Sequence, residues 1–189
     1  MAVATQNKSD RLNGVNLPVL RKLLDDVKRN KDYGMTNWGV TTRWQSGAVS
    51  ETEVTGYEIA GKRVKRNFKF RTDEPFELAG GNTHANPQEY LMGALNACMM
   101  VGYVALSALM GIELEQVEIE SEGEIDLRGF LGIDRNVKAG YDTIHYTVRI
   151  KGNGTPEQFQ KIHEMVTATS PNRFNIANPI RLTSELVLE

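Results

Sequence analysis

The chain has 189 residues, of which 40% are hydrophobic and 24% charged, and this composition excludes an intrinsically disordered protein. Its formal net charge of −2 leaves no excess of positive charge to neutralise phosphates, so nucleic acid is not expected as a partner. The single cysteine, Cys98, excludes an intrachain disulfide and any redox cycle that needs two cysteines in one chain.

The first ten residues are polar and lack the apolar core of a secretory signal, so we expect a cytoplasmic protein. After Asn16, apolar residues recur at helical spacing and predict a helix from about Leu17 to Lys28. We therefore expect an N-terminal helical extension over residues 1–35, followed by one domain over residues 36–189.

Three strand patterns follow this extension. Apolar side chains alternate over residues 38–44, over about 49–59 and over about 64–70. Turn residues separate them, at Ser46-Gly47 and at Ala60-Gly61. The pattern predicts a three-stranded antiparallel meander.

Residues 90–110 carry no formal charge and are apolar on every side, so the segment either spans a membrane or lies buried in a fold. Several glycines and alanines weaken its hydropathy and no basic cluster flanks it, so we expect a buried central helix and no membrane. Asn86 suits the N-cap of this helix and Glu89 suits its third position, where a carboxylate meets the positive helix end. Gly111 is expected to end it.

A long strand is predicted over residues 117–127, where apolar residues alternate with five carboxylates. The next strand, over about 144–151, supplies cations, so we expect cross-strand ion pairs; a cation site would need convergent carboxylates. Thr155 and Gln158 predict a capping box for a helix that stops near Ser170-Pro171.

The remaining pattern completes an α+β fold. Ser170 suits the N-cap of a short helix, and residues 180–188 suggest a final strand. The order of elements predicts largely antiparallel sheet around an apolar helix. Covering that helix needs much partner surface, which suggests a dimer with sheets built from two chains.

The residues show no metal-binding or cofactor motif. The three histidines, His84, His145 and His163, stand far apart and lack ligand spacing. Cys98, by residue type alone, is a small core hydrophobe. It follows Glu89 by nine residues, which on one helix puts the two side chains on opposite faces, about 13.5 Å apart along the axis. A second segment or subunit must join them if they act together.

The stretch from Asn86 to Cys98 matches the pattern N-P-x-E-x-L-x-x-A-x-x-x-C and resembles the OsmC/organic hydroperoxide resistance superfamily. Asp73-Glu74-Pro75 and Gly80-Gly81 extend the resemblance, as does Ser170-Pro171, which stands where the family usually has Cys-Pro. The resemblance covers roughly residues 38–189. It implies an OsmC-like fold in an intertwined homodimer of α+β subunits, with active sites at the subunit interface.

The resemblance also implies roles for individual residues. Cys98 matches the cysteine that attacks a hydroperoxide in the peroxidase members, and Glu89 matches a glutamate that orients the thiolate. Arg71 is our first candidate for the accompanying arginine, and Arg43 is the second. The usual resolving cysteine is replaced by Ser170, which cannot form a disulfide.

Further residues are expected to line the same site. His84 lies in the loop that enters the central helix, and Asn172 and Arg173 follow Ser170 in the chain.

Three functions are compatible with these observations. The first is a one-cysteine thiol peroxidase in oxidative-stress defence, acting on an organic hydroperoxide with an external thiol reductant and no cofactor. The second is a non-enzymatic protein that binds a small apolar or oxidised ligand, or senses redox state through Cys98. The third is another Cys98-dependent reaction, such as hydrolysis or thiol transfer, which we rank last because the sequence places no histidine as its base.

Overall fold

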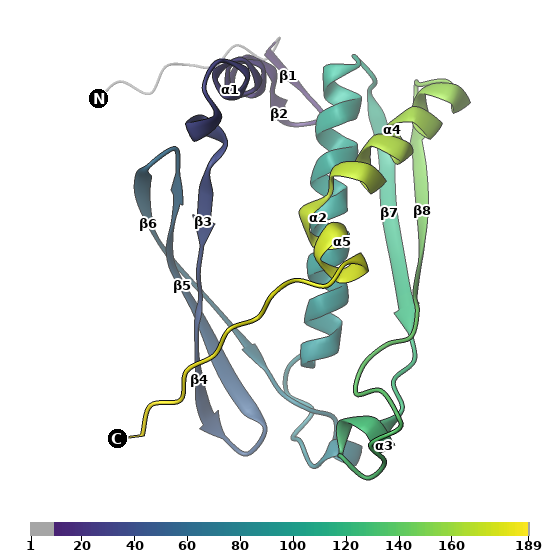
Figure 1. Cartoon of the computed structure of the whole chain (residues 1–189). Coiled ribbons are helices and arrows are strands. Elements are labelled where there is room, and N and C mark those ends of the chain that lie inside the picture. Colours follow the sequence, from purple (N-terminus) through teal and green to yellow (C-terminus); the bar gives the residue numbers. More distant parts are fainter. Residues whose placement is uncertain (1–9, 189) are drawn as a thin grey trace. The chain divides into compact units, whose positions relative to one another are not determined.

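The computed structural model describes residues 10–188, which form two compact units that meet in the chain between Leu91 and Met92 (Figure 1). Residues 1–9, which are part of the segment predicted to lack a secretory signal, lie outside the described residues.

The first unit opens with a short ribbon of β1 (Arg11–Leu12) and β2 (Val15–Asn16), which leads into α1 (Leu17–Arg29). Asn16 caps this helix, since its Oδ1 accepts a hydrogen bond of 3.1 Å from the backbone N–H of Val19. The predicted N-terminal helix is therefore confirmed. Short 3-10 helices follow at η2 (Lys31–Gly34) and, further on, at η3 (Phe76–Leu78).

The first unit contains a four-stranded antiparallel sheet made of β3 (Thr36–Trp38), β4 (Thr41–Ser46), β5 (Val49–Ile59) and β6 (Lys62–Thr72). One edge of β5 pairs with β6, and the other pairs first with β4 and then with β3.

The meander is confirmed, but the single strand predicted over residues 38–44 is wrong. The chain leaves the sheet at Gly39 and Val40. Trp38 pairs with Tyr57 and Thr41 pairs with Glu53, so the register against β5 shifts by one residue across this break. Such a bulge interrupts the ladder and divides the segment into two strands.

The loop between β6 and the next helix is organised by Asp73, whose side chain is buried. Its carboxylate accepts a 2.7 Å bond from the hydroxyl of Thr83 and further bonds from the backbone N–H groups of Glu74, Gly81 and Thr83. These bonds, led by the Thr83 hydroxyl, lower the pKa of Asp73 to about 2. The loop closes tightly, because a Cβ on Gly80 would lie 1.8 Å from the carbonyl oxygen of Glu74.

Helix α2 (Pro87–Leu109) begins in the first unit and continues into the second. It begins at the predicted capping box: Asn86 Oδ1 accepts from the backbone N–H of Glu89, and Glu89 Oε2 accepts from that of Asn86. With a mean hydropathy of 1.6, α2 is long and apolar enough to cross a membrane by length and composition. Its buried residues include Leu95, Met99 and Tyr103, whose spacing of four places them on one face.

The second unit packs helices on one face of a two-stranded antiparallel sheet (Figure 1). The strands are β7 (Leu114–Gly123) and β8 (Ile144–Gly152), and the second helix of the core is α4 (Pro156–Thr169). The fully buried core residues come from α2, α4 and the turn after α2: Leu95, Met99, Tyr103, Ile112, Ile162 and Val166.

The other face of this sheet carries the predicted ion pairs. Arg149 on β8 pairs with Glu118 and Glu120 on β7, and Lys151 pairs with Glu115. The strand predicted over residues 117–127 ends early, at Gly123.

The chain beyond Gly123 turns into the short α3 (Leu127–Phe130), which Asp126 caps by accepting from the backbone N–H of Arg128. A side chain at Gly123 would also meet the ring of Tyr141 at 2.8 Å, so the strand stops where the returning loop packs against it.

The second unit ends with α5 (Pro171–Ala177) and a segment, residues 178–188, without helix or strand. The final strand predicted over residues 180–188 is therefore wrong for this chain. A strand needs a neighbouring edge for its backbone hydrogen bonds, and no described strand pairs with this segment. Its apolar side chains are exposed, with Leu182, Leu186 and Leu188 at 85%, 83% and 86%.

Candidate functional site

The centre of the candidate site is a contact between Cys98 on α2 and Ser170 at the start of α5. The hydroxyl of Ser170 donates a hydrogen bond to Cys98 Sγ across 3.4 Å. Ser170 is buried, with 6% exposure, whereas Cys98 is half-buried and its thiol is free. Two residues separated by 72 positions in the chain are thus joined inside the second unit.

The direction of the Ser170 hydroxyl is unusual for its position. Ser170 occupies the N-cap of α5 with extended backbone, yet its side chain makes no capping bond. Thr155 also stands before a proline at a helix start, and its Oγ1 accepts from the backbone N–H of Gln158. Since Ser170 could do the same, its hydroxyl is engaged by sulfur instead of by the helix end.

The two residues predicted to line the site beside Ser170 hold α5 in place. Asn172 Nδ2 donates to the carbonyl oxygen of Ala94, one turn before Cys98 on α2, across 2.9 Å. Arg173 donates from Nε to Tyr146 Oη on β8 at 3.0 Å and from Nη1 to the carbonyl oxygen of Thr167 at 2.8 Å. The start of α5 is therefore bonded to α2, α4 and β8.

Another polar pair lies in the core of the second unit. Tyr103 is buried, and its hydroxyl shares a 2.6 Å hydrogen bond with His163 Nδ1. Burial raises the pKa of Tyr103 to about 12, with Tyr146 adding to the rise and Arg173 opposing it. His163 is thus a partly buried histidine that is hydrogen-bonded at the edge of the core.

The remaining predicted residues belong to the first unit, where each has a local partner. Arg71 binds Glu51 through Nε and Nη2 at 3.0 Å, and Arg43 binds Glu53 at 3.0 Å. Glu51 also binds Lys69, and these two cations lower the pKa of Glu51, Lys69 having the larger effect.

Glu89 and His84 lie at the entrance to α2. Glu89 serves the capping box, and His84 Nδ1 shares a 2.9 Å bond with the hydroxyl of Thr83 in the Asp73 loop. Tyr90 donates its hydroxyl to the carbonyl oxygen of Arg71, so the end of β6 adjoins the first turn of α2. The meeting of Glu89, Arg71 and His84 with Cys98 stays a prediction.

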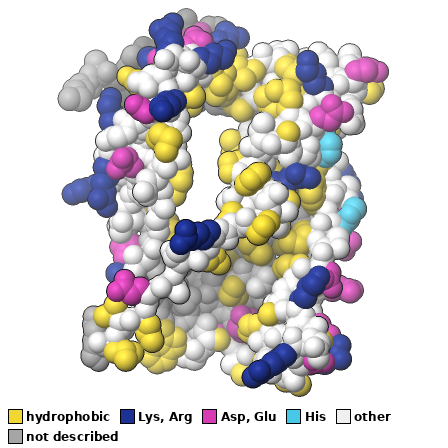
Figure 2. All heavy atoms as spheres, viewed as in Figure 1, with side chains coloured by type: hydrophobic (Ala, Val, Ile, Leu, Met, Phe, Trp, Pro, Cys, Tyr) yellow, Lys and Arg dark blue, Asp and Glu magenta, His cyan; other side chains and the backbone are white. Residues whose placement is uncertain are grey.

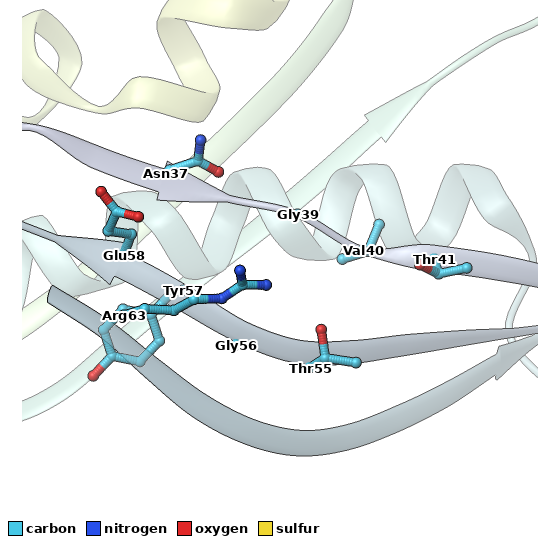
Figure 3. Close-up of a pocket in the computed structure, with 9 residues that line it drawn as sticks. All are labelled: Asn37, Gly39, Val40, Thr41, Thr55, Gly56, Tyr57, Glu58 and Arg63. Atoms are coloured by element: carbon cyan, nitrogen blue, oxygen red, sulfur yellow. The ribbon is translucent and has the colours of Figure 1, made fainter. Parts of the chain in front are cut away.

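A separate pocket lies on the sheet of the first unit, at the place where β5 stops pairing with β4 and begins to pair with β3 (Figure 3). Its volume is about 330 Å³, and none of the predicted site residues lines it. In Figure 3 the polar side chains around it include Asn37, Glu58, Arg63, Thr41 and Thr55. Within residues 10–188, no three His, Cys, Asp or Glu side chains gather closely enough to hold a metal ion.

The sequence did not reveal the polar partners that organise these loops. Tyr146 shows only strand alternation in the sequence, and its bond to Arg173 joins residues 27 positions apart. Asp73 stands out in the sequence only as part of the Asp-Glu-Pro match, although short acidic side chains in loops commonly accept from nearby backbone N–H groups.

Comparisons with known proteins agree with this architecture. A family model described as OsmC-like protein matches residues 80–185. The chain is similar in structure to an OsmC-like protein from Mycoplasma pneumoniae, with a TM-score of 0.59, 11% identity, and coverage of 75% of this chain and 87% of that one.

Two further solved structures show the same likeness. An osmotic-stress-induced and detoxification-response protein from Psychrobacter arcticus gives a TM-score of 0.54 at 13% identity, covering 71% of this chain and 84% of that chain. An OsmC-like protein from Vibrio cholerae gives 0.52 at 13% identity, covering 74% and 92%. A search of curated proteins finds no match.

Proposed function

Because this chain belongs to the OsmC-like protein family, we propose that it is a one-cysteine thiol peroxidase that reduces organic hydroperoxides at Cys98. The observation that supports this most directly is the hydrogen bond from Ser170 to Cys98 Sγ. A buried donor aimed at sulfur stabilises a thiolate, the form of cysteine that attacks peroxides.

The reaction proceeds without a second cysteine. The thiolate of Cys98 attacks the terminal oxygen of the hydroperoxide, the O–O bond breaks, and the alkoxide leaves as an alcohol after taking up a proton. Cys98 becomes a sulfenic acid. One external thiol then forms a mixed disulfide and releases water, and a second external thiol restores Cys98 and leaves as part of a disulfide. The balance is one hydroperoxide and two thiols giving one alcohol, one water and one disulfide.

Ser170 has a defined part in this cycle. Its hydroxyl donates to the sulfur in the thiolate and to the oxygenated sulfur after attack, but forms no disulfide. The sulfenic acid therefore waits for an external thiol, with no cofactor involved. Glu89 and an arginine, Arg71 before Arg43, are proposed to activate and orient the thiolate, and His84 and Asn172 are proposed to line the site.

We propose that the active form is a homodimer in the cytoplasm. Large apolar side chains lie open at the surface of the chain (Figure 2). On the sheet of the first unit Trp44 is 75% exposed and Phe68 is 60% exposed, and on α2 Val101 is 69% exposed. Soluble proteins rarely leave large contiguous patches of such side chains without a covering surface. A second chain supplies that cover and brings further side chains to Cys98.

The test of the proposed function is hydroperoxide consumption by the purified full chain. Cumene hydroperoxide is offered with 2-mercaptoethanol as reductant, and the wild type is compared with Cys98→Ser. We expect turnover above the uncatalysed rate that disappears in Cys98→Ser. Equal rates for the two proteins would refute the peroxidase.

The alternative of a redox sensor or ligand-binding protein is favoured by one observation. Both candidate arginines are engaged by glutamates of β5, Arg71 by Glu51 and Arg43 by Glu53. If they stay engaged, the thiolate of Cys98 depends on Ser170 without their help. A sensor predicts one equivalent of peroxide consumed per Cys98 with no repeated turnover, and a ligand-binding protein predicts no oxidation of Cys98.

A further inference from the structure

The start of α5 is held by one side chain that contacts two other elements. Arg173 reaches Tyr146 Oη on β8 through Nε and the carbonyl oxygen of Thr167 near the end of α4 through Nη1. The side chain is half-buried, and the planar guanidinium presents both donors in one rigid fork. The guanidinium therefore fixes the angle between α4 and α5 at Ser170, the residue that joins them.

Helix α5 cannot hold this position by itself. It has seven residues, whereas isolated helices shorter than about 12–15 residues are marginal in water. Its N-cap hydroxyl is turned toward sulfur and does not cap the helix. The backbone N–H of Ser170 bonds to the carbonyl oxygen of Val166 at the end of α4, but the direction of α5 beyond it depends on tertiary contacts. The bonds of Arg173 tie the start of α5 to both the sheet and α4.

Arg173 binds neutral acceptors, a tyrosine hydroxyl and a backbone carbonyl, and this favours a structural role for its side chain. Among residues 10–188, no carboxylate lies within ion-pair distance of its guanidinium. Thr167 lies in the last turn of α4, whose carbonyl groups lack intrahelical donors and favour a nearby cation. The positive charge of Arg173 also acts on α2, where it opposes the rise in the pKa of the buried Tyr103.

We propose that Arg173 is a positioning residue of the Cys98 site, fixing the start of α5 so that the Ser170 hydroxyl faces Cys98 Sγ. This inference rests on the proposed function, in which the thiolate of Cys98 is the reactive group. Arg173 acts through Ser170 and touches neither the substrate nor the sulfur in this role.

The test is a double-mutant cycle on the alkylation rate of Cys98 by iodoacetamide at neutral pH. Ser170→Ala removes the donor, so a smaller fraction of Cys98 is thiolate and the alkylation rate falls. The remaining thiolate is more nucleophilic and offsets part of this loss, so we expect a net fall of about threefold to tenfold. Arg173→Gln is expected to lower the rate by a similar factor. The double variant is expected to react no more slowly than Ser170→Ala alone.

Two further variants make the outcome decisive. Tyr146→Phe removes one acceptor of Arg173 with little loss of packing, and we expect a smaller fall that also vanishes in the Ser170→Ala background. Arg149→Gln, three residues later on the solvent face of β8, is the matched control and should leave the rate unchanged.

Independent effects would overturn the inference. If the falls caused by Arg173→Gln and Ser170→Ala multiply in the double variant, or if Arg173→Gln leaves the rate unchanged, Arg173 does not act through Ser170. Alkylation consumes no peroxide. A wild type without peroxide turnover would therefore refute the proposed function, while the cycle would still decide the role of Arg173.

Discussion

Ser170 and Thr155 begin helices in the same sequence context, a hydroxyl residue before proline, but their hydroxyls do different things. Thr155 caps its helix, whereas Ser170 donates to Cys98 Sγ. Capping is a local interaction and is predictable from sequence. The engagement of Ser170 by sulfur is not local, and only the resemblance placed these two residues in one site.

Restoring the usual cysteine should test this geometry. In Ser170→Cys, the new sulfur would start about where Oγ lies, 3.4 Å from Cys98 Sγ, so a modest side-chain adjustment brings the two within bonding distance. We predict an intrachain disulfide after one equivalent of hydroperoxide, measured by thiol titration and non-reducing mass analysis. Two thiols remaining free after oxidation would show that position 170 is not suited to resolve Cys98.

The stabilising effect of the Asp73 carboxylate should be lost in acid. Its folded pKa, about 2, lies below the unfolded value of 3.8, so the folded state binds its proton less readily. The stability that it contributes is present above 3.8 and is lost as the pH falls toward about 2. We predict that Asp73→Asn lowers the urea midpoint at neutral pH and that the difference from wild type shrinks below pH 3.8.

A companion variant separates charge from packing at this loop. Thr83→Val removes the hydroxyl that lowers the pKa of Asp73 most. Thr83→Val should lower the urea midpoint at neutral pH, but by less than Asp73→Asn does. A difference between Asp73→Asn and wild type that persists unchanged to pH 2 would contradict the assigned role of the carboxylate.

At the scale of elements, the correct predictions are those that rest on local physics. The capping boxes at Asn86 and Thr155 fix the starts of α2 and α4, and both appear where the sequence indicates. The strand predicted over residues 38–44 is wrong because its register against β5 shifts by one residue between Trp38 and Thr41. The strand predicted over residues 180–188 is wrong because a strand requires a neighbouring edge, and no described strand supplies one. Periodicity describes a segment and says nothing about its partner.

The loop that leads to α2 gives a prediction at this scale. Gly80→Ala would put a methyl group 1.8 Å from the carbonyl oxygen of Glu74, so the loop must open. We expect a loss of about 1–3 kcal/mol, read as a lower melting temperature. Gly140→Ala is the matched control, because a Cβ there meets nothing within 4 Å. Equal melting temperatures for the two variants would contradict the packing described for this loop.

At the scale of the whole molecule, the chain leaves a large apolar surface without cover among its described residues. The exposed side chains lie on the sheet of the first unit, on α2 and along residues 180–188. The sequence predicts a dimer because the central helix needs a large partner surface to cover it. The exposed apolar side chains of the C-terminal segment are a second reason to expect a dimer.

We predict that the chain sediments at twice its mass of 21.1 kDa. Leu182→Glu should raise the dimer dissociation constant at least tenfold, since burying a leucine contributes about 1.5–3 kcal/mol. Thr183→Glu, the next residue along the segment, is the control and should leave the constant unchanged. A wild type that sediments as a monomer at micromolar concentration would contradict the dimer.

The central claim is that Cys98, with Ser170 as its donor and no resolving cysteine, is oxidised by a hydroperoxide and reduced by an external thiol. The most direct measurement is mass spectrometry of the full chain after one equivalent of cumene hydroperoxide, with dimedone present as a trap and Cys98→Ser as control. The account predicts one dimedone adduct on Cys98 and, without the trap, return to the starting mass after addition of 2-mercaptoethanol. An unmodified Cys98, or oxidation that the thiol does not reverse, would contradict it.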